Sequence, residues 1–282
     1  MWPLEPSSRE YLRVGGKSIE RWMGTASRLD CIASHPLLRR SHESMRSANW
    51  PELEAGLRTV YADKPRSAVT LLLESALMPA LLLEAGPELW APAQVQALLQ
   101  HRLVALYGAP GEPPDAWDTR IDHLAGEQFT LGFGLRTSLK HTILSACASV
   151  GIDCRRLLPA FAWGLSRLNG AKELPERRGW LGWAEQDRLL LAHLESGRAV
   201  TLNAAARIAT DSAAIVRQVE TERVRCGLAQ SGPIVATRWS NASHDAGMAT
   251  RTIGQAVTWI DIGHGTGANV RGPAASTMAS QP

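Results

Sequence analysis

One segment near the carboxyl end of the sequence has the residue types that could hold a nucleotide phosphate. Residues 261–267, with the sequence DIGHGTG, follow the apolar run Ala256–Ile260. Their carboxylate could organise a magnesium ion, and their glycines would let backbone N–H groups approach phosphate oxygens. A phosphate cradle also needs a helix N-terminus or a backbone nest behind it, and residues 268–282 have little helical pattern. A flexible tail is therefore the favoured interpretation, and the remaining cofactor-binding candidates are Asp261, Gly263, Gly265 and Gly267.

No other stretch of the sequence carries a complete catalytic motif. The tripeptide Gly15-Gly16-Lys17 lacks the GxxxxGK[ST] spacing of a phosphate-binding loop and is typical of a hairpin turn. There is no GxSxG nucleophile elbow, and the 8 histidines form no HExxH pair. We therefore expect no catalytic residue and no metal site.

A few acidic residues could form a general acid–base pair. Asp118 and Asp122 share one face of a predicted strand, and Glu127 follows shortly after. Paired carboxylates can perform acid–base catalysis when their pKa values are tuned. Salt bridges with Arg120 or Arg136 are the favoured interpretation.

The cysteines and tryptophans favour structural roles. The 4 cysteines form no CxxC pair, which predicts buried free thiols and a reducing, cytoplasmic compartment. The sequence has 10 tryptophans, and several lie at the ends of predicted elements, where packing is favoured and a partner interface is the alternative. These cysteines and tryptophans are Cys31, Cys147, Cys154 and Cys226, and Trp90, Trp117, Trp163, Trp180 and Trp183.

Composition excludes several classes of protein. The chain has 282 residues, of which 45% are hydrophobic and 20% charged, as is typical of a globular protein with a core. The net charge is +3, with Lys and Arg spread along the sequence, so we expect no nucleic-acid partner. No signal peptide is visible, and no apolar run approaches the roughly 20 residues that span a bilayer. We expect a cytoplasmic protein with no direct membrane span, recruited to the inner membrane by a partner if it works there.

The first part of the sequence alternates predicted strands and helices. Short apolar runs between turn residues predict strands, and apolar residues at i, i+4, i+7 predict helices. The predicted strands are Glu10–Val14, Ser18–Met23, Leu29–Ala33, Ala68–Leu73, Leu81–Glu84, Trp117–Leu124, Gln128–Leu135 and Ile152–Leu158. The predicted helices are Pro51–Tyr61, Ala91–Tyr107, Thr137–Val150 and Pro159–Leu168.

A polar break at Asn169–Arg178 separates this part from a second group of elements. The predicted elements there are the strands Gly179–Ala184, Arg188–Leu194, Ala199–Leu202 and Pro233–Arg238, and the helix Asp211–Leu228. After Trp239, Ser, Ala, Gly and Thr dominate, and only Ala256–Ile262 is expected to be ordered.

This order of elements predicts an α/β protein with two ribonuclease-H-like (actin-like) lobes. Each lobe would hold a mixed sheet flanked by helices, because a run of antiparallel strands followed by a helix occurs twice. We expect the first lobe to cover residues 1–170, a smaller second lobe residues 171–240, and a mostly disordered tail residues 241–282.

Three stretches resemble a group of bacterial actin-like proteins. Val69–Gly108 is similar to the first lobe of the type IV pilus platform protein PilM and of the cytoplasmic part of type II secretion protein L. The matching features are a strand pair, a turn with Glu88 and Trp90, and a helix that ends at Tyr107-Gly108. Leu135–Asn169 and Trp180–Val200 continue the likeness, which covers roughly residues 10–239.

The resemblance implies a degenerate member of this group. Members with a full nucleotide site bind ATP through a DxG-type phosphate loop at the start of each lobe. Here Val14-Gly15-Gly16-Lys17 has no Asp two residues before its first Gly, and Glu185-Gln186-Asp187 has no Gly after it. The implied function is a pseudo-ATPase without a cofactor, which would act as a scaffold for protein partners of a pilus or secretion platform. An active actin-like ATPase or small-molecule kinase with atypical phosphate loops, using ATP and magnesium, remains the alternative.

Overall fold

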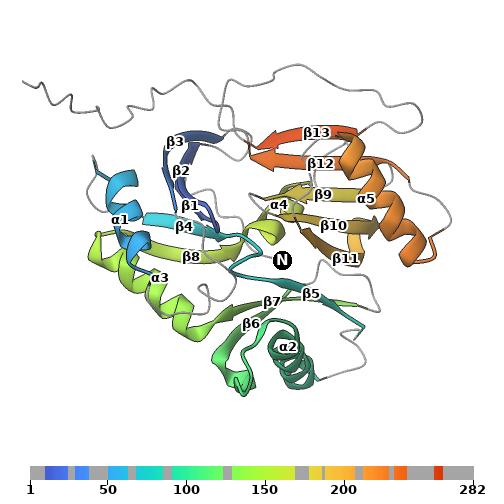
Figure 1. The fold of residues 1–282 in the computed structure, drawn as a ribbon, viewed down its shortest axis with the longest axis horizontal. Coiled ribbons are helices and arrows are strands. Elements are labelled where there is room, and N and C mark those ends of the chain that lie inside the picture. Colours follow the sequence, from blue (N-terminus) through green and yellow to red (C-terminus); the bar gives the residue numbers. More distant parts are fainter. Residues whose placement is uncertain are drawn as a thin grey trace, which may run out of the picture.

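Two five-stranded sheets lie side by side in the structure, with a smaller three-stranded sheet next to them (Figure 1). The structure is a computed structural model. It describes residues 10–24, 29–37, 50–62, 68–84, 91–122, 129–168, 178–185, 188–206, 212–228, 232–239 and 257–262.

The first sheet has the strand order β3-β2-β1-β4-β8. β1 (Glu10–Val14), β2 (Ser18–Gly24) and β3 (Leu29–Pro36) form an antiparallel meander, whereas β4 (Ala68–Leu73) and β8 (Asp153–Pro159) continue it in parallel. The turn after β1 is closed by the Gly15 N–H, which donates to the Ser18 carbonyl at 3.0 Å. The predicted hairpin at Gly15-Gly16 is therefore confirmed.

The second sheet repeats this topology, with the order β11-β10-β9-β12-β13. β9 (Gly179–Ala184), β10 (Arg188–Glu195) and β11 (Arg198–Ala206) are antiparallel, and β12 (Ile234–Trp239) and β13 (Val257–Ile262) follow in parallel. The Glu185 N–H donates to the Arg188 carbonyl at 2.8 Å, as Gly15 does to Ser18 in the first lobe. The prediction of two related α/β lobes is confirmed.

Helices cover the outer faces of both sheets and fill the space between them (Figure 1). α1 (Pro51–Val60) and α3 (Thr137–Ser149) lie on the first sheet, and α5 (Ser212–Arg225) lies on the second. α4 (Ala160–Leu168) lies between the sheets, directly after β8. α1 begins at a proline, which suits a first helical turn, and buries Leu53, Leu57 and Val60 at helical spacing.

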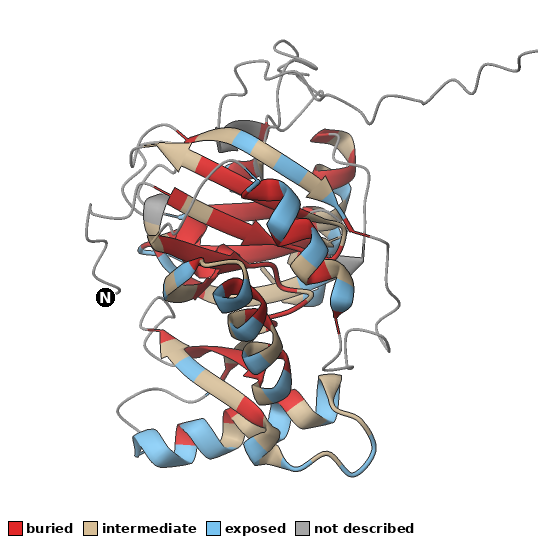
Figure 2. Cartoon of the chain, turned by 90° about the vertical axis from the view of Figure 1, so that its left-hand side faces the viewer, coloured by how far each residue is buried: buried red, intermediate tan, exposed pale blue. Residues whose placement is uncertain are grey.

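The third sheet has the order β5-β7-β6 and packs against one long helix. Its strands are β5 (Ala80–Leu83), β7 (Thr130–Arg136) and β6 (Trp117–Asp122), and a short 3-10 helix, η2 (Pro114–Ala116), precedes β6. α2 (Pro92–Tyr107) buries Val95, Leu99 and Leu103 against this sheet, and its other face is exposed (Figure 2).

One continuous hydrophobic core joins the two lobes. It contains Trp22, Phe161 and Trp163 from the first part of the chain together with Trp183 and Val235 from the second. A separate cluster lies under α5 and another under α2. Trp117, Trp163, Trp180 and Trp183 are all buried, as the packing interpretation predicts, and Trp90 lies outside the described residues.

Some details differ from the sequence predictions. Leu106 continues the helical spacing of Leu99 and Leu103 but is 61% exposed, because the buried stripe of α2 ends one turn earlier, at Leu103. All four cysteines are free thiols, as predicted, but only Cys147 is buried, whereas Cys31, Cys154 and Cys226 are partly buried. The run expected across Ala256–Ile262 forms β13, so the second sheet includes residues beyond 240. Residues 169–177, 240–256 and 263–282 lie outside the described residues.

Candidate functional site

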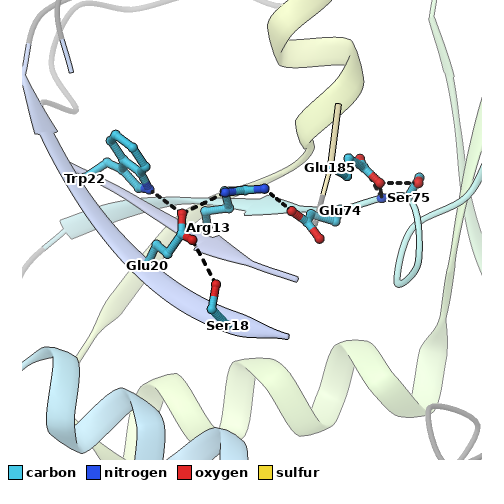
Figure 3. Close-up of polar contacts among 7 residues, drawn as sticks. All are labelled: Arg13, Ser18, Glu20, Trp22, Glu74, Ser75 and Glu185. Carbon is cyan, nitrogen blue, oxygen red and sulfur yellow. Dashed lines mark hydrogen bonds and ion pairs between the residues drawn. The ribbon is translucent and has the colours of Figure 1, made fainter. Parts of the chain in front are cut away.

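A buried polar cluster lies where the two lobes meet. Parallel strands place their carboxyl ends at the same edge of a sheet, and the ends of β1 and β4 lie near Glu185, which directly follows β9 (Figure 3). Ligands of open α/β sheets bind outside the carboxyl ends of the strands. The residues of this interlobe cluster are Arg13, Ser18, Glu20, Trp22, Glu74, Ser75 and Glu185.

Arg13 is the centre of the interlobe cluster. Its Nη1 donates to Glu20 Oε2 at 2.7 Å, and its Nη2 forms an ion pair with Glu74 Oε1. The side chain of Arg13 is 4% exposed and that of Glu74 is 0% exposed. Burial opposes the charge of Arg13, but Glu74 and Glu20 outweigh this effect and raise the pKa of its guanidinium. Arg13 is therefore a buried, permanently charged cation between two carboxylates.

Glu20 is held in its ionised form. Burial alone would raise its pKa, but the charge of Arg13, together with hydrogen bonds from Ser18, Arg13 and Trp22, lowers that pKa below its ordinary value. Ser18 Oγ donates to Glu20 Oε1 at 2.9 Å, and Trp22 Nε1 donates to Glu20 Oε2 at 3.0 Å. Both carboxylate oxygens of Glu20 are thus satisfied by residues of the first lobe.

Glu185 links the second lobe to the first. The Ser75 backbone N–H donates to both oxygens of this carboxyl, at 2.9 Å and 3.0 Å, and Ser75 Oγ contacts Oε2 (Figure 3). Burial, together with the negative charge of Glu74, raises the pKa of Glu185 to about 8, although the hydrogen bonds from Ser75 oppose this shift. Burial and Glu74 therefore oppose ionisation of this carboxyl, whereas the donors of Ser75 favour it.

Trp239, the last residue of β12, covers the guanidinium of Arg13. The Arg13 Cζ atom lies 4.8 Å from the centre of the Trp239 ring, within the range of a cation–π contact. Trp239 also stacks on Trp163 of α4, with ring centres 5.4 Å apart, and contacts Trp22 at 5.1 Å and Trp183 at 6.1 Å. Indole rings from both lobes therefore pack around the Trp239 ring that covers this cation.

The close contact between α4 and the second lobe depends on Gly164. A Cβ atom at this position would overlap the indole ring of Trp183. Trp183 is fully buried and also meets the Phe161 ring edge-on at 6.5 Å. Only a residue without a side chain lets the helix lie flat on this indole.

The strand pairings of the two lobes match, so they show which residues of the two lobes occupy equivalent positions. β1 pairs with β4 through Arg13↔Leu72, and β9 pairs with β12 through Trp183↔Thr237. Because Gly15 and Glu185 close equivalent turns, Arg13 corresponds to Trp183. A DxG phosphate loop would need an acidic residue at both positions, and the chain has a guanidinium and an indole instead. Neither group is a ligand for magnesium, which requires oxygen donors.

Of the four cofactor-binding candidates in residues 261–267, the structure describes only Asp261. Asp261 lies on β13, where its backbone is in register with Arg238 of β12. Gly263, Gly265 and Gly267 lie outside the described residues. β13 runs parallel to β12, so Asp261 lies near the carboxyl edge of the second sheet, the edge at which Trp239 ends β12.

Asp118 has a different partner from the arginines that the sequence favours. Asp118 forms an ion pair with Lys140 of α3, and Arg136 pairs with Glu112. The interaction partners lie on other elements because β6 and β7 pack against α3 and the loop before η2, which a strand pattern does not reveal. Glu127 lies outside the described residues.

Within the part of the chain that the structure describes, no three His, Cys, Asp or Glu side chains are grouped so that they could hold a metal ion. Among the same residues, no helix is both long and apolar enough to cross a bilayer.

Sequence reasoning missed most members of the interlobe cluster. It noted that no acidic residue precedes Gly15, but it did not identify Arg13, Glu74 or Glu185 as interacting residues. Arg13 and Glu74 are 61 positions apart, and Ser75 and Glu185 are 110 apart. The only available signal was a charged residue inside an otherwise apolar strand, at the position where an acid was expected.

Comparisons with known proteins support the fold. No protein-family model and no curated protein matches the sequence of this chain. Solved structures do match. One belongs to the PilM–PilN type IV pilus biogenesis complex, with 13% identity over 92% of this chain and 91% of that chain, and a TM-score of 0.58. A second, from Bacteroides thetaiotaomicron, has an actin-like ATPase fold and unknown function, with 11% identity, coverage of 84% and 85%, and a TM-score of 0.52.

A third similar structure is the cytoplasmic domain of EpsL, an inner-membrane component of the type II secretion system of Vibrio cholerae. It shares 17% identity over 90% of this chain and 89% of that chain, with a TM-score of 0.49. The first two comparisons, together with the repeated sheet topology, show that the chain has the actin-like fold.

Proposed function

We propose that this chain is a non-catalytic actin-like scaffold of a bacterial type IV pilus or type II secretion assembly. It would act in the cytoplasm, next to the inner membrane, by binding protein partners of the platform. The chain would need no nucleotide for this function.

This proposal rests on the contacts that Arg13 makes in the interlobe cluster. At the position where a DxG loop would supply an acid for magnesium, Arg13 supplies a cation that is already paired with Glu20 and Glu74. Trp239 covers the same guanidinium. A magnesium–nucleotide complex would have to displace a partly buried indole and two buried ion pairs, and breaking buried ion pairs is costly.

The choice of partner rests on the nature of the similar proteins. A chain that covers nearly the whole length of this one comes from the PilM–PilN complex. The type II secretion alternative rests on the sequence resemblance of Val69–Gly108. We propose a PilN-like inner-membrane protein as the partner, bound through its cytoplasmic segment.

Isothermal titration calorimetry of the purified full chain with ATP and magnesium tests the pseudo-ATPase part. We expect no binding up to about 1 mM nucleotide, a concentration that detects interactions as weak as roughly −4 kcal/mol. A nucleotide-binding actin-like protein, measured in parallel, is the positive control. Micromolar affinity for ATP and magnesium would contradict the proposal.

A second titration tests the scaffold part. The cytoplasmic segment of the PilN-like protein from the same genome is added to the full chain, with and without ATP and magnesium. We expect saturable 1:1 binding whose affinity is the same in both conditions. Absence of binding, or binding that requires nucleotide, would argue against a nucleotide-independent scaffold.

The alternative function, an actin-like ATPase or small-molecule kinase, is favoured by one observation. Asp261 lies near the carboxyl edge of the second sheet, ahead of a glycine-rich stretch. If the full chain does bind ATP, a chain ending at Ile262, which keeps β13 but lacks Gly263, Gly265 and Gly267, and an Asp261→Ala variant should both lose that binding. Loss in both variants would establish the alternative, whereas retention in both would exclude residues 261–267 as the phosphate site.

A further inference from the structure

Three side chains of the first lobe surround one aromatic ring of the second. They are Arg13 of β1, Trp22 of β2 and Trp163 of α4, here called the indole socket, and the ring is that of Trp239 at the end of β12. We propose that Trp239 acts as an internal ligand of this socket and holds the two lobes in one closed arrangement without any bound molecule. This inference concerns the lobes alone and goes beyond the proposed function, so either can fail without the other.

The sequence of β12 places Trp239 on the face that meets the first lobe. Alternate residues of a strand point to the same face, so Trp239 shares its side with Val235, which lies in the core that joins the lobes. β12 pairs with β9 only as far as Thr237↔Trp183, and Trp239 continues beyond this pairing. The ring is therefore carried past the last paired residue of β9 to the guanidinium of Arg13.

Three contacts of the Trp239 ring cross from one lobe to the other. The ring stacks on Trp163 with centres 5.4 Å apart and 15° between the planes, lies tilted against Trp22 at 5.1 Å, and lies 4.8 Å from Arg13 Cζ. Aromatic pairs and cation–π contacts each add to the free energy gained by burial. Trp239 Nε1 is buried and has no hydrogen-bond partner among the described residues, so packing and the cation hold the ring.

Two further contacts oppose rotation of the lobes about this ring. Ser75, after β4, donates its backbone N–H to both carboxyl oxygens of Glu185, after β9, at 2.9 Å and 3.0 Å. At the edge of the second sheet away from β12, β11 contacts β5 of the third sheet (Figure 1). These three attachments involve β12, β9 and β11, which are spread across the second sheet. Rotation about any one of them would break another.

Native-state hydrogen exchange of the full chain tests the closed arrangement without any variant. The Ser75 amide is the reporter, because it donates to Glu185 across the interface. Its exchange is measured in increasing urea below the unfolding transition, beside amides at the centres of β1 and β9. Locked lobes expose Ser75 only on global unfolding, so all these amides should show the same urea dependence. Opening at Ser75 with little urea dependence, while β1 and β9 stay protected, would show freely hinging lobes and overturn the proposal.

Trp239→Ala tests the role of the ring itself. The loss of a large side chain from the core should speed exchange at Ser75 by about 100-fold, and Ser75 should now open before β1 and β9 do. Trp180→Ala is the matched control, because it removes a buried indole from the cluster under α5, whose buried members all belong to the second lobe. In that variant Ser75 should open together with the strands. Early opening of Ser75 in both variants, or in neither, would contradict the proposal.

Free indole provides a readout that a general loss of stability would not give. Trp239→Ala leaves the indole socket without its ring, and a cavity with an apolar lining can bind a small aromatic molecule. Indole should bind this variant saturably in calorimetry and should slow its Ser75 exchange back toward the wild-type rate, because a ligand of the closed form stabilises it. Absence of binding, or binding that leaves Ser75 exchange unchanged, would argue against the socket. If Trp239→Ala does not fold, the urea series on the wild-type chain decides.

Discussion

A single guanidinium neutralises the carboxylates between the lobes. Arg13 bridges Glu20 and Glu74, and none of the three side chains has appreciable contact with water. Removing one partner of a buried ion pair leaves the other charge uncompensated, which costs more than the pair itself contributes. The identity of this one residue therefore decides the stability of the interlobe contact.

We expect Arg13→Ala to destabilise the protein by about 3–5 kcal/mol, because Glu20 and Glu74 would remain buried without a cation. Urea unfolding followed by circular dichroism measures the loss. Arg58→Ala is the matched control, since Arg58 pairs with Glu54 on the surface with its side chain 61% exposed, and it should cost less than about 1 kcal/mol. Equal losses in the two variants would show that the interlobe charges are not coupled as described.

Replacing Gly164 with alanine should change the stability of the protein in the opposite direction from most glycine-to-alanine substitutions in helices. Glycine to alanine inside a helix normally stabilises by about 1 kcal/mol. Gly164→Ala should instead destabilise by roughly 1–3 kcal/mol, because the new methyl group would overlap the Trp183 ring and force the core apart. Ser145→Ala on the exposed face of α3 provides the control, and there the ordinary small gain in helix propensity should appear in a thermal melt. Stabilisation by Gly164→Ala would contradict the observed packing.

One arginine at the junction of β7 and α3 contacts three neighbouring segments of the part of the molecule that holds the third sheet. Arg136 pairs with Glu112 at 2.8 Å, donates to the Tyr107 carbonyl at 2.6 Å, and lies over the Trp117 ring at 4.8 Å. It therefore contacts the end of α2, the following loop and the start of β6. A planar guanidinium with several donors can make all three contacts, whereas an ammonium group cannot.

Arg136→Lys should loosen α2 and β6 without unfolding the two lobes. We expect faster hydrogen exchange in Pro92–Tyr107 and Trp117–Asp122, while the amides of β9 and β10 stay protected. Lys140→Ala removes the partly exposed pair with Asp118 and is the control, with a smaller effect expected. An exchange pattern in α2 that is unchanged by Arg136→Lys would show that the other contacts of the helix are sufficient.

Local patterns predicted nearly all of the elements, because turns and helix spacing depend on neighbours in the sequence. The turn between β10 and β11 is an example. Ser196 and Gly197 both have positive φ values, of 51° and 77°, which matches a tight hairpin connection. The boundary of α2 was likewise indicated by Pro92 and Gly108.

The arrangement of these elements was only partly accessible from the sequence. The parallel pairing of β4 with β8 brings together distant segments, and no local pattern encodes it. The ion pairs of Asp118 and Arg136 were misassigned for the same reason. Burial of Arg13 could not be inferred either, because an arginine in a short strand normally faces solvent and becomes buried only when partners from other strands are present.

β13 closes one edge of the second sheet, and its removal should affect the whole molecule. A chain that ends at Trp239 lacks this strand, so the backbone groups of β12 along that edge would be unpaired. We expect a lower melting temperature and concentration-dependent aggregation, measured by light scattering. A chain that ends at Ile262 keeps β13 and is the control, which should melt like the full chain. Equal behaviour of the two truncated chains would show that β13 contributes little.

The hydrophobic core that passes through both sheets has a consequence for dissection of the protein. Four indole rings from the two lobes pack on one another, those of Trp22, Trp163, Trp183 and Trp239. Each lobe therefore shields part of the apolar surface of the other from water. If the gene were cut at the junction, each half would present a patch of bare indoles to solvent. Co-expression of the halves, rather than purification of either alone, is therefore the practical route to a split reporter built on this scaffold.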